Sequence, residues 1–168
     1  MSSQIGHHRI KHLRIQRCGG RIIKINSLHI LNIFTLVLVP AEVENELRKN
    51  KVSLPKKIKV LKLKSEFKDV VKILANEENL GLGEAEAIAL SLQEKVGCFV
   101  TDDLEAREVA KRYHLEVHGT IGIVLRALKD KLINKKTALE AVEKLKSNSS
   151  LFITQDLIDN IVNSINEF

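Results

Sequence analysis

The chain has 168 residues and a formal net charge of +6, with 27 lysine and arginine residues against 21 aspartate and glutamate residues. Its apolar and charged fractions, 44% and 29%, are typical of a globular protein and argue against long disordered stretches. The chain has no tryptophan, one tyrosine and five phenylalanines, which argues against a nucleic-acid surface built mainly on aromatic stacking. The positive charge permits a polyanionic partner.

The cysteines and the apolar runs limit the cellular compartments in which the protein is expected. Cys18 and Cys98 have no metal-ligand spacing and are predicted to be free thiols in a reducing compartment. The longest apolar run, around residues 33–39, is too short to span a membrane, and the basic N-terminus lacks the apolar core of a signal peptide. We therefore expect a soluble, cytoplasmic protein with no membrane partner.

In the first part of the chain, strand patterns alternate with helix patterns. The predicted elements are a short strand at 13–15, a buried helix at 21–34, a strand at 35–39 covered on both faces, a helix from Pro40 to about Lys49, and an edge strand at 58–63 whose lysines discourage further pairing.

The alternation continues to about residue 117, and helices follow. The predicted elements are a helix capped by Ser65, a helix at 84–94, a strand at 98–101, a helix through Tyr113, a strand at 115–117, a helix at 121–129 capped by Thr120, a helix at 136–146, and a last helix that begins at Thr154 with Ile153 and Ile158 as a hydrophobic staple. This order predicts one parallel-sheet α/β domain with an added C-terminal helical pair.

Four carboxylates stand at element ends and are the candidate functional residues: Glu46, Glu84, Asp102 and Asp103. The first is about one turn into the helix after a buried strand, the second opens a helix, and the two aspartates end a strand. Side chains at such places meet at the carboxyl edge of a parallel sheet. Carboxylates held close together repel unless a cation neutralises them, and Mg²⁺ or Mn²⁺ prefers such oxygen ligands. The cation can activate water for attack at phosphorus, and basic side chains around it would hold a nucleic-acid backbone.

Each of these acids also has a purely structural interpretation. Glu84 is favoured at a helix N-terminus by the macrodipole, with Glu86 as a solvated neighbour. Either aspartate can cap the following helix, and Glu46 can pair with a nearby basic residue on a wet face.

Several stretches, in their order and spacing, resemble the PIN-domain superfamily, in particular its DUF3368 type of predicted nucleic-acid-binding proteins. These stretches are INSLHILNIF, VPAEVENEL, GLGEAEAIALSL, FVTDDLEAREVAKRY and HGTIG, and the likeness runs from about Ile22 to the C-terminus. We therefore divide the chain into an atypical basic segment, 1–21, and a PIN-like domain, 22–168.

The resemblance implies a parallel sheet sandwiched by helices, an acidic pocket for Mg²⁺ or Mn²⁺, and ribonuclease activity on RNA, often as the toxin of a toxin–antitoxin pair. The family's metal-binding acids fall on Glu46, on Glu84, and on Asp102 or Asp103. Thr101 and Thr120 stand where hydroxyls would support the site.

The chain departs from this family pattern at its first strand. The family places an aspartate at the end of that strand, near Ile15 here, but no acid precedes Glu42. The alternative function is therefore a catalytically impaired PIN-like module that binds RNA or protein. The apolar positions of the last helix, from Leu157 to Ile165, are expected to belong to the core or to an interface with an antitoxin or a second copy of the chain.

Overall fold

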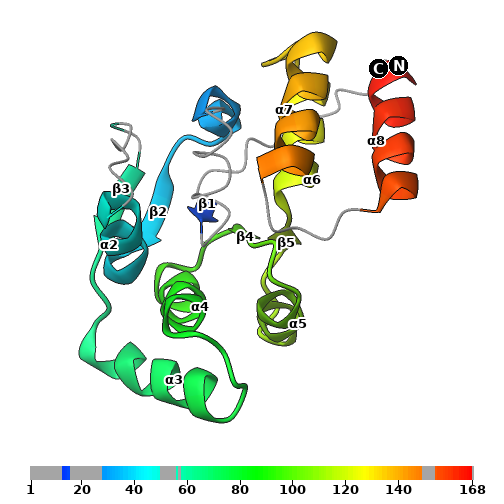
Figure 1. The fold of residues 1–168 in the computed structure, drawn as a ribbon. Coiled ribbons are helices and arrows are strands. Elements are labelled where there is room, and N and C mark those ends of the chain that lie inside the picture. Colours follow the sequence, from blue (N-terminus) through cyan, green and yellow to red (C-terminus); the bar gives the residue numbers. More distant parts are fainter. Residues whose placement is uncertain (1–12, 16–27, 50–55, 57, 149–153, 168) are drawn as a thin grey trace, which may run out of the picture.

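The computed structural model describes residues 13–15, 28–49, 56, 58–148 and 154–167, which form a mixed α/β fold with short parallel strands, as predicted (Figure 1). The strands are β1 (Leu13–Ile15), β2 (Val37–Pro40), β3 (Ile58–Leu61), β4 (Cys98–Val100) and β5 (Val117–His118). The helices are the 3-10 helix η1 (Leu28–Ile33), α2 (Ala41–Lys49), α3 (Ser65–Asn76), α4 (Leu82–Glu94), α5 (Leu104–Arg112), α6 (Thr120–Lys129), α7 (Lys135–Asn148) and α8 (Gln155–Glu167).

The five strands form one parallel sheet in the order β3-β2-β1-β4-β5. β1 lies at its centre, with Leu13 opposite Val37 of β2 and Ile15 opposite Val100 of β4. β3 lies at the edge, as predicted, and its Lys59 is exposed. The central strand thus comes from the basic segment ahead of residue 22, and the boundary placed there stays a prediction.

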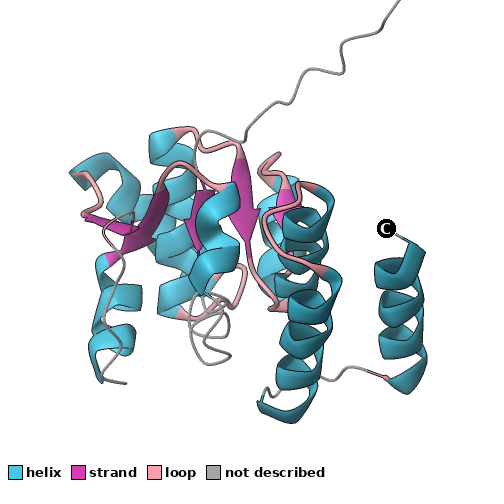
Figure 2. Cartoon of the chain, turned by 90° about the horizontal axis from the view of Figure 1, so that it is seen from above, coloured by secondary structure: helices cyan, strands magenta, loops and turns pink. Residues whose placement is uncertain are grey.

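Two apolar clusters share the strand β4. Cys98 and Val100 belong to a cluster with η1, β2, α6, α7 and α8, whereas Phe99 belongs to a cluster with α3, α4 and α5. All three side chains are fully buried, and successive residues of a strand point to opposite faces. Seen from above, the strands lie among the helices in the middle of the molecule (Figure 2).

The last helix, α8, contacts α7, and three of its apolar residues are buried: Ile158, Ile161 and Ile165. Core contacts therefore account for most of its apolar face, while Leu157 is 45% exposed. Thr154 accepts the Leu157 N–H through its hydroxyl (3.3 Å), as expected at the start of this helix. Ile153 of the predicted staple lies outside the described residues.

Several predicted boundaries were wrong in detail. Pro40 is the last residue of β2, opposite Leu61, because its fixed φ also suits extended backbone. Ser65 is the first helical residue of α3 and not its cap: the N-cap position belongs to Lys64, whose side chain makes no capping bond. The third strand ends at Leu61, and the fifth begins at Val117, two residues later than predicted. Of the helix predicted at 21–34, the structure describes only the end, which is 3-10 in form.

Candidate functional site

Asp102 lies at the carboxyl edge of the sheet, at the point where the strand order diverges. From the central strand β1 the chain proceeds to β2 and β3 on one side, whereas β4 and β5 lie on the other. The connections therefore diverge between β1 and β4, and ligands of open α/β sheets bind outside the strand ends at such a point. Asp102 follows β4 directly after Thr101, so it lies next to the end of β1.

The Asp102 carboxylate joins the end of β4 to the start of α6. Its Oδ1 accepts the backbone N–H of Thr120 (2.8 Å), and its Oδ2 accepts the Thr120 hydroxyl (2.6 Å). Thr120 is fully buried, so both bonds are shielded from water. The two bonds fix the orientation of the carboxylate at the end of β4.

This bonding corrects the predicted role of Thr120 as a helix cap. Gly119 occupies the N-cap position of α6, and no side chain caps it there. The Thr120 hydroxyl binds Asp102 instead, because a charged acceptor makes the stronger hydrogen bond.

Asp103 caps the helix that follows it, which is the structural role considered for it from the sequence. Its Oδ1 accepts the Ala106 N–H (2.8 Å), which makes it the N-cap of α5. Its own N–H donates to the hydroxyl of the buried Thr101 (3.1 Å). The Thr101 hydroxyl therefore fixes the backbone at Asp103. The geometry favours Asp102 over Asp103 as the acid that faces the sheet edge.

Glu84 lies in the first turn of α4 and is only 8% exposed. Its carboxylate folds back over Gly81, so closely that a Cβ on Gly81 would lie 2.3 Å from Glu84 Oε2. A side chain at position 81 would therefore displace the carboxylate. The N–H groups at the helix start favour the negative charge of Glu84 in this first turn.

Glu86 is not the solvated neighbour that the structural interpretation supposed. It is half-buried, and its Oε2 accepts the backbone N–H of Glu42 at the start of α2 (3.4 Å). This carboxylate therefore satisfies one of the unpaired donors at the N-terminus of α2 and brings the start of α2 to α4. Sequence reasoning missed this pair, because residues 84 and 86 are two apart in a helix and do not share a face, so their spacing gave no signal.

The electrostatics of this pair follow from burial. Burial raises the pKa of the Glu86 carboxyl, the hydrogen bond from the Glu42 N–H lowers it, and the charge of the Glu42 carboxylate raises it again; the net shift is upward. Two carboxylates thus lie close enough to oppose each other's ionisation. A divalent cation relieves such repulsion.

Glu46 lies one turn after Glu42 in α2, on the same face of that helix. The structure describes its backbone but not its side chain, so its part in the site stays a prediction. The carboxylates have the oxygen chemistry that Mg²⁺ and Mn²⁺ require. However, across the described side chains no three His, Cys, Asp or Glu groups are close enough to hold a metal ion. A cation held by one or two carboxylates and by water needs fewer ligands from the protein.

The end of β1 supplies no acid. Its last residue is Ile15, where the resemblance leads one to expect an aspartate, and the first acid in the chain is Glu42. The central strand therefore contributes no acid to the carboxyl edge.

Comparison with known families identifies the family of the chain. The chain matches the DUF3368 model, a PIN domain, over residues 21–167, and it belongs to this PIN-domain family. No curated protein and no solved structure gives a significant match. None of the helices in the described ranges is long and apolar enough to cross a membrane.

The bonds between Asp102 and Thr120 generate a first prediction. Thr120→Val keeps the side-chain shape but removes the hydroxyl donor, and we expect it to lower the free energy of unfolding by about 1.5–3 kcal/mol, as for a hydrogen bond to a charged group. Urea denaturation measures this. The matched control is Thr137→Val, whose hydroxyl bonds the neutral Asn134 Oδ1 in an exposed position and should cost about 1 kcal/mol or less. Equal losses in the two variants would contradict the stabilising role of the Asp102 bonds.

The raised pKa of Glu86 generates a second prediction. The folded state binds the Glu86 proton more tightly than the unfolded chain, so the contribution of Glu86 to stability falls as the pH rises from 4.5 through the raised pKa. Glu86→Gln removes this fall. We expect the difference in unfolding free energy, variant minus wild type, to increase with pH over this range. Denaturant titrations at a series of pH values measure it, and a constant difference would show that the Glu86 pKa is not raised.

Proposed function

We propose that the protein is a metal-dependent ribonuclease of the PIN type, which hydrolyses RNA phosphodiesters with Mg²⁺ or Mn²⁺. The observation that carries the proposal is the Asp102 carboxylate, which two hydrogen bonds from Thr120 fix at the carboxyl end of β4. Membership of a PIN-domain family and the net charge of +6 support it.

In this proposal Glu46, Glu84 and Asp102 hold the cation with water, and Glu86 adds negative charge beside them. Asp103, counted among the metal-binding acids from the sequence, contributes mainly by capping α5. The bound cation would supply a water of lowered pKa and would offset charge that develops on the phosphate. The protein's own part is to keep these carboxylates oriented by Thr120, by the start of α4 and by the start of α2.

The proposal extends to the setting of the protein. A sheet sandwiched by helices with a C-terminal pair is supported by the two clusters that share β4 and by the contact of α7 with α8. We also propose a cytoplasmic location and, from the resemblance to PIN-domain proteins, an antitoxin partner. The exposed Leu157 on α8 offers apolar surface for that partner or for a homodimer.

A second function is favoured by the end of β1. Without an acid at Ile15, the centre of the edge has fewer ligands than the family pattern provides. The alternative is a catalytically impaired PIN-like module that binds RNA or protein. It predicts RNA binding that weakens steeply with salt and is indifferent to divalent metal.

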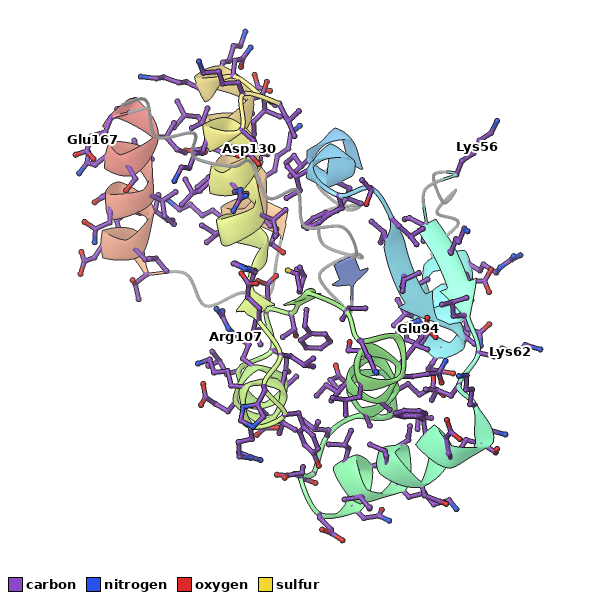
Figure 3. The ribbon with its side chains drawn as sticks, turned by 180° about the vertical axis from the view of Figure 1, so that it is seen from behind. Lys56, Lys62, Glu94, Arg107, Asp130 and Glu167 are labelled. Carbon is purple, nitrogen blue, oxygen red and sulfur yellow. The ribbon has the colours of Figure 1, made fainter. Side chains whose placement is uncertain are left out.

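The test is cleavage of single-stranded RNA by purified protein with Mg²⁺ or Mn²⁺. We expect cleavage that EDTA abolishes and that Glu84→Gln lowers by about 100-fold or more, because a metal ligand matters at least as much as its outer-shell partners. Glu94→Gln, on the exposed last turn of the same helix, is the matched control and should cleave as wild type does (Figure 3). RNA binding without metal-dependent cleavage would establish the alternative function.

A further inference from the structure

We propose that Arg107 binds a phosphate of the RNA strand at the carboxyl end of β4, beside Asp102; this inference rests on the proposed function and names the group that receives its substrate. Arg107 lies near the start of α5, where its backbone N–H donates to the Asp103 carbonyl (3.0 Å). The helix cap thus fixes its backbone at the sheet edge. Figure 3 shows the side chain extending from α5.

The position of the guanidinium follows from the close approach at Gly119. A Cβ on Gly119 would lie 2.9 Å from Asp102 Oδ1 and 3.3 Å from Arg107 Nη1. The carboxylate and the guanidinium therefore both lie over the same backbone atom, at the turn between β5 and α6. Asp102 cannot move aside without breaking its bonds to Thr120. Only glycine leaves room for both groups.

Arg107 also differs from the other arginines whose side chains the structure describes. Arg48 pairs with Glu44, Arg112 with Glu78, and Arg126 with Asp130. Within the described part of the chain, Arg107 has no such ion pair, and Glu108, whose pKa its charge helps to lower, is bonded to Lys111 instead. Arg107 is half-buried, and the N–H groups of its guanidinium are available to another acceptor.

Binding of RNA beside a carboxylate requires a positively charged group. RNA carries a negative charge on each phosphate, and the Asp102 carboxylate lies beside the place of the guanidinium. A polyanion approaches carboxylates only where positive charge compensates the repulsion. A guanidinium is planar and always charged, and it binds phosphate through two parallel hydrogen bonds. Arg107 therefore places one phosphate next to the proposed metal-binding acids.

The experiment measures binding of a fluorescein-labelled single-stranded RNA by anisotropy, in EDTA to prevent cleavage. We expect Arg107→Gln to weaken binding by about tenfold, the loss of a charge-assisted contact. Between about 50 and 200 mM salt, the slope of log K against log salt should become smaller by about 0.7, one phosphate contact on a single strand. Arg112→Gln is the matched control, because it removes the same charge from the same helix at its far end. It should bind as wild type does.

A second variant separates contact from charge. Gly119→Ala keeps every charge, but its added Cβ would lie 2.9 Å from Asp102 Oδ1 and 3.3 Å from Arg107 Nη1, so it crowds both groups, and we expect it to weaken RNA binding as well. Thermal unfolding of each variant shows whether it is folded at the binding temperature. If Arg107 only neutralises Asp102, Arg107→Gln lowers the melting temperature and leaves both the RNA affinity and the salt slope unchanged, which overturns the inference alone. A wild-type protein that binds no RNA overturns the proposed function and this inference together.

Discussion

The two hydrogen bonds from Thr120 to Asp102 are the interaction on which the carboxyl edge depends. They connect the end of a buried strand, β4, to the start of α6, and they hold a carboxylate in a place where its charge is partly shielded from water. Two other contacts lie beside these bonds. Asp103, the next residue, caps α5, and the backbone at Gly119 passes close to Asp102 and Arg107. A buried charge is tolerated when its hydrogen bonds are satisfied, and here they also orient it.

Much of the fold was predictable because its strands are short, apolar and regularly spaced. The run before Pro40 and the strand that ends at Thr101 both became buried parallel strands, and the lysines near Lys59 correctly marked an edge. Helix starts were less predictable. Ser65 and Thr120 have cap-forming side chains, but the choice of cap depends on which partners the tertiary structure supplies, and Thr120 found a carboxylate eighteen residues away.

The candidate site was predictable in place but not in its pairings. Glu84 and Asp102 were identified because helix starts and strand ends have local signatures. The contact of Glu86 with Glu42 joins residues 44 apart in the chain, and no local pattern encodes it. The choice between Asp102 and Asp103 needed the structure for the same reason. The missing acid near Ile15 was visible in the sequence, and the pairing of Ile15 with Val100 shows that this gap lies at the centre of the sheet edge.

The central claim is that the acids around Asp102 bind a divalent cation although β1 provides none of them. Anomalous scattering from crystals grown with Mn²⁺ tests it most directly, because it locates the ion without relying on activity. We expect one strong peak at the carboxyl edge, within coordination distance of Asp102 and of Glu84 or Glu46. Well-ordered carboxylates with no peak at that edge, at an Mn²⁺ concentration that saturates ordinary Mn²⁺ enzymes, would contradict it.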